Sequence, residues 1–521
     1  MALSRKFIRN ASIGTIGLGG WLYLKTNNYD PASFGLLRLF RAAVTVFQIG
    51  SHYKNSLYKC NLDKKSPEYL NLKSKVHKHS AEKLLELCCV NKGVYIKVGQ
   101  HIGALDYLLP QEYVSTMKVL HNSAPQSSFE DVLTVIKEDF KKDPYEIFES
   151  IDQVPLGTAS LAQVHKAVLK DGRVVAVKVQ HHSVKKNFYV DMKTMETLVK
   201  LTSIIFPDFN FDWLVNETKT NVPKELDFTK EGENAEKLQK YFAHCHWLKI
   251  PKIYWDFCSS RVLTMEYLDG GQINDLKYIC KNNISAEEIC NKLGYLYSHM
   301  IFTTGFVHSD PHPGNILVKQ KGAEAEIILL DHGLYASLSN DFRLEYSKLW
   351  LAIMNGDKTA MKIHCKNLGV TDFYGILVCM VSGRSWNTII NGVQKTQYTK
   401  SENQFLQNEI QNILPQISSI LQNIDRQMLL LFKTNDLIRG IEHSLKVETK
   451  MSGFLEMSRC CINSIYGEKI KQSNSKWSTI KFSIMKQWAL IKLSMYYTYL
   501  SLINFDLNKQ IESVWSSDLY L

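Results

Sequence analysis

Three polar residues late in the chain have the spacing of a catalytic loop. Asp310 and Asn315 lie five residues apart, and Asp331 follows the apolar run 327–330 and precedes Gly333. In phosphotransferases an Asp at the first position orients the attacking hydroxyl or water, while the Asn and the D-x-G Asp hold Mg²⁺ against nucleotide phosphates. Asp before Pro is common in turns and Asp before Gly in bends, so each residue alone decides little. Their order predicts a nucleotide site with Asn315 and Asp331 as metal ligands.

An upstream lysine and glutamate are predicted to complete this site. Lys178 follows an alternating apolar run, after an Asp171-Gly172 turn that predicts a β-hairpin. A lysine at this place binds the α- and β-phosphates of a nucleotide. Because a lysine on an edge strand is usually solvated, Lys178 needs a partner, and the candidate is Glu231, on a helix that Asp227 helps to start. A helical insertion over about residues 185–220 is predicted between the two.

Residues 260–271 are predicted to form a strand that ends at Gly270-Gly271 and serves as a hinge between two lobes. Met265 and the backbone groups of Glu266 and Leu268 would meet the adenine edge of the nucleotide; a plain strand and turn is the alternative. With the hinge included, the candidate residues follow the chain order of a phosphotransferase: Lys178, Glu231, Asp310, Asn315 and Asp331.

The composition is that of a folded protein with a basic surface. At about 150 residues per domain, 521 residues allow about two to four domains, and 45% hydrophobic with 22% charged residues argues against extensive disorder. The net charge of +11 suggests contact with nucleic acid, nucleotides or acidic membrane surfaces, with a merely basic solvated surface as the alternative. Eleven cysteines without a C-x-x-C motif indicate neither a zinc nor a thioredoxin-like site, and they fit free thiols in a reducing compartment.

The first fifty residues are basic and partly apolar. Four basic residues precede the first acid, Asp30, and the apolar run 11–24 is shorter than the roughly 17–25 residues that span a bilayer. A second apolar segment, 34–49, carries two arginines and no acid. This pattern predicts a mitochondrial targeting region over residues 1–50 with a retained membrane anchor; a disordered cytosolic leader is the alternative.

Residues 69–109 have a helical pattern that Pro110 closes. Gly99 and Gly103 lie four residues apart on one helix face, where they would let another backbone approach closely. Lys97, taken by itself, is more often a surface lysine than a ligand.

The C-terminal part of the chain is predicted to be helical over residues 340–450, apart from a polar loop at 395–403, and to form the core of the larger lobe. Residues 469–492 contain six lysines and no acid, interleaved with Trp and aliphatic residues, and residues 493–505 are uncharged and aromatic. This tail suits a membrane-surface helix attracted to anionic lipid, and docking on the rest of the chain is the equal alternative. Nucleic acid is not expected as a partner, since no stacking platform or recognition helix accompanies the lysines.

Together these motifs resemble the UbiB/aarF-domain-containing (ADCK) family of atypical kinase-like proteins over about residues 80–440. The K-x-G-Q motif of the family matches Lys97, Gly99 and Gln100, and its alanine-rich loop in place of a glycine-rich one matches Gly157, Thr158, Ala159 and Ser160 through Gln163. Its E-x-D motif matches Glu225 and Asp227, and its helix-C glutamate matches Glu231.

The resemblance implies an α+β, two-lobed protein-kinase-like fold. The expected parts are a helical extension with the K-x-G-Q motif (51–145), a small β-rich N-lobe (146–268), a helical C-lobe (269–468) and a basic aromatic tail (469–521). It also implies binding of ATP or ADP with Mg²⁺, and a regulatory role for the K-x-G-Q and E-x-D residues. In the family the K-x-G-Q helix packs over the active site and is thought to obstruct peptide substrates, with Lys97 expected near Glu225.

The same resemblance implies a mitochondrial setting, associated with the inner membrane. Membrane lipids and inner-membrane proteins are then the expected partners, with roles in coenzyme Q biosynthesis, lipid homeostasis and cristae organisation. Three features depart from ordinary protein kinases. Only Gly157 stands where three glycines are usual, and no proline occurs between Pro313 and Pro415 to supply an A-P-E motif; in addition, His332 replaces the usual Phe after Asp331. The expected function is an ATP/Mg²⁺-dependent phosphotransferase or ATPase. A nucleotide-binding scaffold is the alternative, and a true protein kinase comes third.

Overall fold

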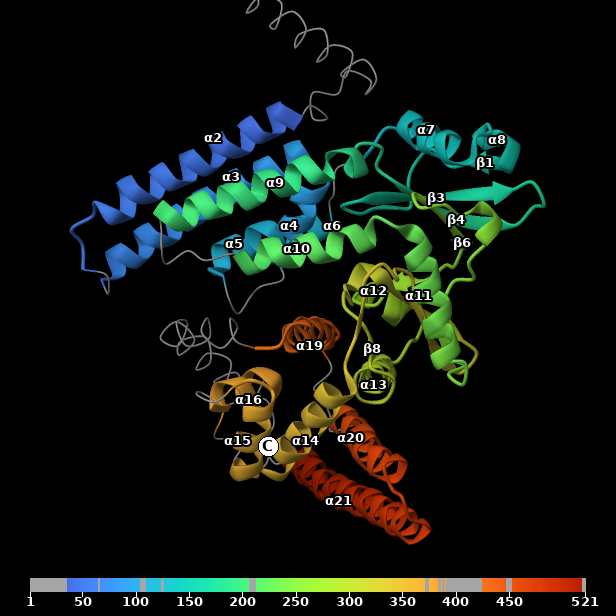
Figure 1. Ribbon diagram of the computed structural model, residues 1–521. Coiled ribbons are helices and arrows are strands. Elements are labelled where there is room, and N and C mark those ends of the chain that lie inside the picture. The colour runs from blue at the N-terminus through green and yellow to red at the C-terminus, as the bar shows by residue number, and fades with distance from the viewer. Residues whose placement is uncertain are drawn as a thin grey trace, which may run out of the picture. The chain divides into compact units, whose positions relative to one another are not determined.

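The chain divides into two compact units (Figure 1). The first comprises Met1–Lys237, Pro251–Leu268 and Asp331–Leu334, and the second comprises Leu238–Ile250, Asp269–Leu330 and Tyr335–Leu521. Leu268 and Asp269 fall on either side of the division, and the N-terminal helices share the first unit with the β-rich part of the chain. The computed structural model describes residues 35–63, 66–103, 109–122, 126–205, 212–370, 374–382, 386, 389, 424–446 and 452–517.

A five-stranded antiparallel sheet forms the centre of the first unit. Its strands are β1 (Phe148–Ile151), β2 (Gly157–Thr158), β3 (Ala162–Leu169), β4 (Val174–Gln180) and β6 (Val262–Glu266). The order is β1-β3-β4-β6, with β2 paired to β3. The predicted hairpin between β3 and β4 is confirmed, and Gly172 in its turn has φ 83°, which an L side chain rarely adopts. Because β4 has a neighbour on each side, Lys178 does not lie on an edge strand.

Two helices pack against this sheet, α7 (Phe129–Phe140) and α8 (Pro144–Ile147). Alternate residues of β3 and β4 face the same side, so apolar residues at every second position make one continuous core surface. That core joins the helix to the strands through Val132, Val135, Ile136, Ala167, Leu169, Val175, Val177, Val179 and Val262.

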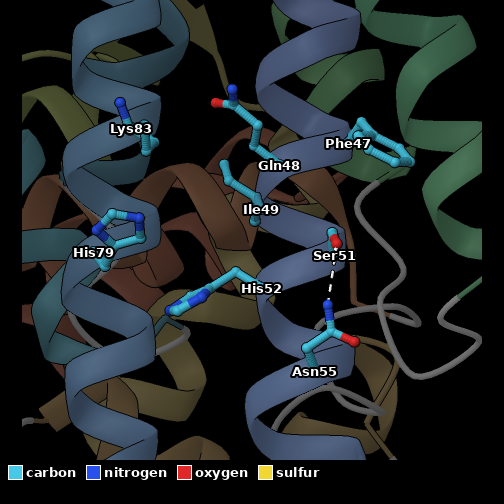
Figure 2. A pocket seen from close by; sticks show the side chains of 8 residues that line it. All are labelled: Phe47, Gln48, Ile49, Ser51, His52, Asn55, His79 and Lys83. Atoms are coloured by element: carbon cyan, nitrogen blue, oxygen red, sulfur yellow. Dashed lines mark hydrogen bonds between the residues drawn. The ribbon is translucent and has the colours of Figure 1, made fainter.

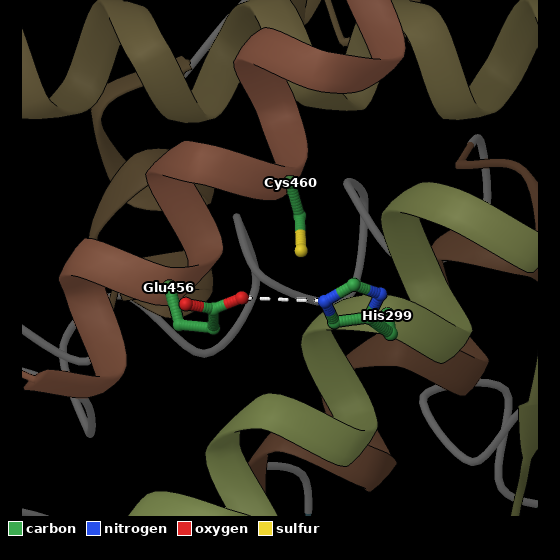
Figure 3. Close-up of side chains that lie close together, drawn as sticks. All are labelled: His299, Glu456 and Cys460. Atoms are coloured by element: carbon green, nitrogen blue, oxygen red, sulfur yellow. Dashed lines mark hydrogen bonds and ion pairs between the residues drawn. The ribbon is translucent and has the colours of Figure 1, made fainter. Parts of the chain in front are cut away.

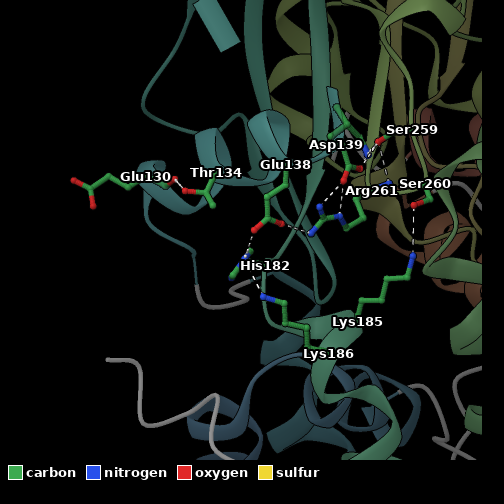
Figure 4. Close-up of polar contacts among 11 residues, drawn as sticks. Glu130, Thr134, Glu138, Asp139, His182, Lys185, Lys186, Ser259, Ser260 and Arg261 are labelled. Atoms are coloured by element: carbon green, nitrogen blue, oxygen red, sulfur yellow. Dashed lines mark hydrogen bonds and ion pairs between the residues drawn. The ribbon is translucent and has the colours of Figure 1, made fainter. Parts of the chain in front are cut away.

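Arg261 fastens α7 to the strand β6 (Figure 4). Its Nη1 lies 3.0 Å from the carboxylate of Glu138, and its Nε donates to Oδ1 of Asp139 at 2.9 Å. The hydroxyl of Ser259 also donates to Asp139, at 2.6 Å. Burial alone would raise the pKa of the Asp139 carboxyl, but the hydrogen bonds from Arg261 and Ser259 outweigh it and hold that pKa below its usual range.

The N-terminal helices of the first unit are α2 (Gly35–Tyr53), the π-helical η2 (Lys54–Tyr58), α3 (Pro67–Asn91), α4 (Val94–Gly103), α5 (Gln111–Met117) and α6 (Val119–Asn122). The helical pattern over 69–109 is confirmed where the structure describes it, and Lys92 and Gly93, with φ of 57° and 55°, separate α3 from α4. Residues 104–108 lie outside the described part of the chain. The close approach predicted at Gly103 is confirmed, since a Cβ there would lie 3.1 Å from the backbone carbon of Met117. At Gly99 the neighbour is instead a side chain, that of Leu120.

Residues 35–50 belong to α2, which packs along α3 and α9 (Val184–Ile205). Arg38 is buried in this packing and forms a two-pronged ion pair with Asp191, with its Nε 2.7 Å from Oδ1 and its Nη2 2.5 Å from Oδ2. This part of the predicted leader is therefore integral to the first unit. The predicted helical insertion is confirmed by α9 and α10 (Asp212–Glu225).

A pocket of about 410 Å³ lies beside Ser51 of α2 and Asn55 of η2, which are hydrogen-bonded to each other (Figure 2). His52 and His79 line it from α2 and α3, with ring centroids 4.9 Å apart. None of the residues predicted to bind nucleotide or metal contributes to its wall, so the pocket is not part of the predicted site.

The second unit contains two small sheets. One has the order β5-β10-β9-β7 and the other pairs β11 with β8. Their bounds are β5 (Leu248–Lys249), β7 (Gly271–Gln272), β8 (Phe306–His308), β9 (Ile316–Lys321), β10 (Glu324–Leu329) and β11 (Tyr335–Ser337). The apolar runs that flank the predicted catalytic loop are thus strands, as expected.

Helices make up the rest of the second unit. They are α12 (Leu276–Lys281), α13 (Ala286–Ser298), the π-helical η4 (His299–Thr304), α14 (Asn340–Asn355), α15 (Lys358–Asn367), α16 (Tyr374–Ser382), α19 (Arg426–Ser444), α20 (Ser452–Lys471) and α21 (Lys476–Ser517). The helical prediction for 340–450 is confirmed where the structure describes it, and the predicted loop 395–403 lies outside that part. Among the described residues no helix is both long and apolar enough to cross a bilayer.

An ion pair joins η4 to α20 (Figure 3). His299 Nε2 lies 3.2 Å from Glu456 Oε1, and the Cys460 thiol lies beside both groups, within 4.8 Å. Burial raises the pKa of the Cys460 thiol to about 12. Glu456 is also 3.7 Å from Arg459. Because the carboxylate of Glu456 already has His299 and Arg459 as partners, we interpret the cluster as a structural contact between η4 and α20.

Replacing Arg261 tests how far the α7–β6 contact stabilises the first unit. Arg261→Leu leaves two carboxylates beside one another without their cation, so we expect the free energy of unfolding to fall by about 2–4 kcal/mol near neutral pH. The loss should shrink as pH falls through the lowered pKa of Asp139, because a protonated carboxyl needs no cation. Urea unfolding at several pH values measures both effects.

Arg173→Leu is the matched control. Arg173 pairs with Asp171 on the surface, with side chains 45% and 49% exposed, and water screens such a pair, so we expect little change in stability. Equal losses for the two variants would contradict the importance given to Arg261.

Candidate active site

Lys178 lies at the centre of a buried polar cluster in the first unit. Its Nζ donates to both carboxylate oxygens of Glu231, at 2.7 and 2.9 Å, and lies 3.3 Å from Oδ2 of Asp331. The side chains of Lys178 and Glu231 are 10% and 3% exposed, whereas that of Asp331 is 33% exposed. The structure therefore brings together three of the residues that the sequence predicted, and it leaves the carboxylate of Asp331 open to solvent.

The charges of this cluster depend on one another. Burial lowers the pKa of Lys178, but the carboxylates of Asp331 and Glu231 outweigh burial and raise it, so the lysine stays charged. The pKa of Glu231 is raised to about 7, because burial of the carboxyl outweighs the opposing effect of the nearby Lys178. A buried carboxylate of this kind is stable only beside its cation, which fixes the position of both side chains.

Helix α11 (Phe228–Tyr241) presents Glu231 in its first turn. Asp227 begins the helix as predicted: its Oδ1 accepts hydrogen bonds from the backbone N–H and the hydroxyl of Thr229, at 3.2 and 2.7 Å. The carboxylate of Glu231 thus lies near the positive end of the helix dipole, which favours its ionised form.

The segment after strand β10 is held against the same helix. The backbone N–H of His332 donates to Glu231 at 3.4 Å, and its carbonyl accepts from the amide of Asn234 at 3.0 Å. The N–H of Gly333 donates to Oδ1 of Asp331 at 2.8 Å. His332 is buried, as expected for a residue that replaces a packing Phe. These contacts aim Asp331 at Lys178.

The K-x-G-Q motif lies on α4, and its lysine is not on the surface. Lys97 Nζ is 2.6 Å from Oε2 of Glu225, the last residue of α10, and the two side chains are 8% and 10% exposed. The proximity expected from the resemblance is therefore confirmed. Gln100 donates from Nε2 to the carbonyl of Leu120 at 3.0 Å, so it holds α4 to α6.

The alanine-rich loop begins at a position open to ligand. A Cβ added to Gly157 would meet nothing within 4 Å. The hydroxyl oxygen of Thr158 is buried and has no hydrogen-bond partner in the described part of the chain. Ala159 donates from its backbone N–H to the carbonyl of Ala162 at 2.7 Å, which closes a tight turn around the buried Ser160. The unpaired hydroxyl of Thr158 and the free space beside Gly157 are consistent with a polar ligand that binds at this loop.

A network of side chains holds this loop, and the sequence did not predict it. Gln163 is buried; its Oε1 accepts from the N–H of Ser127 at 2.9 Å, and its Nε2 lies 2.9 Å from Nε2 of His165. The Ser127 hydroxyl lies 2.7 Å from Nδ1 of His181, and Nε2 of His181 lies 3.2 Å from the carbonyl of Ala159. Polar residues at alternate positions of an otherwise apolar strand were the available sign, but only the fold shows that Ser127 and His181 complete the network.

The predicted strand over 260–271 is too long, because β6 ends at Glu266 and a separate short strand, β7, begins at Gly271. Met265 and Glu266 pair with Ala176 and Val175 of β4. The backbone N–H of Glu266 donates to the carbonyl of Lys252 at 2.8 Å, so this donor is already used within the first unit. The contact of Met265, Glu266 and Leu268 with adenine stays a prediction.

The catalytic-loop residues Asp310 and Asn315 belong to the second unit. The carbonyl of Asp310 accepts from the N–H of His312 at 2.7 Å and from Nδ2 of Asn315 at 3.4 Å. His308 is buried before the loop and lies 3.3 Å from the Tyr297 hydroxyl. The loop is thus a compact turn that begins at the end of β8 and ends with the 3₁₀ turn Pro313–Asn315.

Asn315 and Asp331 are divided between the two units, so their shared role as metal ligands stays a prediction. The residues themselves fit an adenine nucleotide with Mg²⁺. Asp331 offers a partly exposed carboxylate and Asn315 an amide oxygen, and Mg²⁺ prefers oxygen ligands. Lys178 supplies a fixed cation for phosphate, and Gly157 with Thr158 supplies an open backbone and a buried hydroxyl.

Replacing Gln163 tests whether the network positions the loop. Gln163→Leu leaves the N–H of Ser127 and the ring of His165 buried without their partner, so we expect the free energy of unfolding to fall by about 1–3 kcal/mol. If the loop contacts nucleotide, the affinity for ADP should fall as well, in a titration followed by calorimetry. Gln239→Leu, at an exposed position of α11, is the control and should change neither quantity. Unchanged stability in Gln163→Leu would refute the network.

The chain matches known proteins along nearly its whole length. A model of the ABC1 atypical kinase-like domain matches residues 119–365. The chain is 54% identical to AarF domain-containing kinase 1 of Drosophila melanogaster, over 96% of this chain and 98% of the relative. It is 46% identical to AarF domain-containing protein kinase 1 of Mus musculus, over 95% and 94%. Among solved structures, the complex structure of Rv3197-erythromycin from Mycobacterium tuberculosis has a TM-score of 0.46 and 19% identity, over 74% of this chain and 97% of that one. The chain belongs to the ABC1/AarF family of atypical kinase-like proteins, with the two-lobed α+β fold of that class.

Proposed function

We propose that this protein is an ATP/Mg²⁺-dependent phosphotransferase or ATPase. The observation that carries the proposal is the cluster of Lys178, Glu231 and Asp331, in which a buried lysine is held at 2.7 Å by a glutamate and has a half-exposed aspartate beside it. In kinase-like proteins this arrangement presents one fixed cation and one metal-binding carboxylate to the nucleotide phosphates.

Each residue has a distinct role in this proposal. Lys178 binds the phosphates, and Glu231 positions Lys178 without touching the nucleotide. Asp331 and Asn315 hold Mg²⁺, which neutralises charge on the phosphate oxygens when it is bound. Asp310 orients the attacking hydroxyl or water and accepts its proton, a role worth about 10²–10⁴ in rate.

The accepting substrate is proposed to be small or lipid-like. The sequence has no A-P-E motif after Asp331, and this motif belongs to the segment on which ordinary kinases dock peptides. In addition, the Lys97–Glu225 ion pair holds the K-x-G-Q helix firmly in the first unit. Both observations favour altered substrate access over transfer to proteins.

The proposed setting is the mitochondrion, associated with the inner membrane. Its basis is the basic, acid-free start of the chain and the family resemblance drawn from the motifs. Membrane lipids, and inner-membrane proteins, are the proposed partners, and support of cristae, lipid or coenzyme Q homeostasis is the proposed outcome.

The second candidate function is a nucleotide-binding scaffold that works without phosphoryl transfer. The absence of an A-P-E motif favours it, while the presence of all the predicted site residues argues against it. Expression in null cells separates the two. Mitochondrial morphology restored by Asp310→Asn or Lys178→Arg would establish the scaffold, and loss of rescue in both variants, at normal protein levels, would establish the enzyme.

Replacing Asp310 tests the enzyme directly. In purified full-length protein with Mg²⁺, Asp310→Asn should reduce ATP turnover by about 10²–10⁴, because the amide cannot accept a proton, while ADP binding persists. Asp341→Asn, at an exposed position in the first turn of α14, is the control and should turn over ATP like the unchanged protein. Unchanged turnover in Asp310→Asn would remove this residue from the mechanism.

A further inference from the structure

Helix α21 lies on the outside of the second unit. It returns along α20 after a short turn, and α20 in turn packs on α13 and α14. The half-buried side chains of Phe482, Ala489 and Leu493 are spaced so that they share one face of α21. The opposite face of the same helix is therefore the one turned away from the unit.

That opposite face carries a continuous apolar stripe. Its six residues are spaced three or four apart, so they fall within about 80° of the helix circumference over a length of about 27 Å. All are strongly exposed: Trp477 81%, Ile480 50%, Ile484 64%, Trp488 57%, Ile491 48% and Met495 65%. An amphipathic surface helix normally turns its apolar side inward, and this one also presents apolar residues outward.

Lysines border the stripe. Lys481 and Lys492 follow one edge and Lys476 the other, and all three are exposed. The ammonium group of Lys492 lies 5.5 Å from the ring centroid of Trp488. No acid occurs between Glu468 and Asp506 in the sequence. The stripe is therefore bordered by positive charges, with no acid in this part of the sequence to offset them.

We infer that the stripe is a docking surface for an anionic phospholipid bilayer, with α21 lying in the plane of the interface. Apolar side chains would enter the acyl boundary, Trp477 and Trp488 would sit at the headgroup level, and the lysines would contact the anionic headgroups. The inference rests on the proposed membrane setting and makes it specific, because it names the helix face and the lipid charge.

Charge decides between this occupant and a second copy of the chain. Helices that pair through apolar seams usually place opposite charges along the two edges of the seam. Two copies of α21 would bring lysines against lysines, and no acid of this stretch could pair with them. An anionic surface would instead pair with all three lysines, Lys476, Lys481 and Lys492.

Vesicle co-sedimentation of purified full-length protein tests the inference. The probes are vesicles of phosphatidylcholine alone and vesicles with about 30% phosphatidylserine. We expect binding to the anionic vesicles at least about tenfold tighter than to the neutral ones, weakened by added salt. Ile484→Asp should abolish this binding, and Lys481→Glu with Lys492→Glu should reduce it at least about tenfold.

Ile363→Asp is the matched control, since Ile363 is 52% exposed on another helix of the same unit. Ile363→Asp should bind vesicles like the unchanged protein. Circular dichroism should show that both Ile363→Asp and Ile484→Asp are folded. Quenching of tryptophan fluorescence by brominated lipid should fall in Trp488→Phe, which places the contact on α21 itself.

Three outcomes would overturn the inference. They are equal binding to neutral and anionic vesicles, full binding by Ile484→Asp, and concentration-dependent self-association that Ile484→Asp removes while vesicles are not bound. The result is separable from the proposed catalysis, because Asp310→Asn should bind vesicles normally and Ile484→Asp should turn over ATP in detergent solution.

Discussion

The buried ion pair of Lys178 and Glu231 is the constraint on which the first unit depends. A charge removed from water is tolerated only beside its partner, so the elements that carry the two residues must keep a fixed distance. Lys178 lies on a strand with neighbours on both sides, and Glu231 lies in the first turn of a helix that Asp227 caps. The segment after β10 is hydrogen-bonded to the same glutamate. The carboxylate of Glu231 therefore fixes both the position of Lys178 and the orientation of Asp331.

Around this pair, the chain has fixed polar contacts where an ordinary kinase has a flexible glycine-rich loop. Ordinary kinases close a mobile glycine-rich loop over the phosphates. Here the buried Gln163, together with the half-buried Ser127 and His181, forms a hydrogen-bonded network that holds the corresponding loop. A second buried pair, Lys97 with Glu225, holds the K-x-G-Q helix in the same unit. The chain therefore has the lysine and glutamate proposed to act on phosphate, together with hydrogen bonds that fix the alanine-rich loop.

The helices α2 and α21 are both basic and apolar in sequence, but they differ in which side chains they bury. α2 carries a basic, apolar sequence typical of a leader, yet Arg38 is buried against Asp191 and makes the helix part of the first unit. α21 carries a similar composition and turns its Trp and Ile residues outward. The two helices are similar in composition. They differ because Arg38 of α2 has a buried acidic partner, Asp191, which ties α2 to the first unit.

The sequence by itself determined the β3–β4 hairpin, the helical insertion and the identity of the polar residues of the site, because these depend on local spacing and on residue chemistry. It also determined the family. It did not determine contacts between residues far apart in the sequence. The central place of β4 in its sheet, the burial of Lys97 and the contact of Ser127 with His181 are of this kind. Only the tertiary structure decides which polar group meets which, since a buried charge or amide chooses its partner by distance in space.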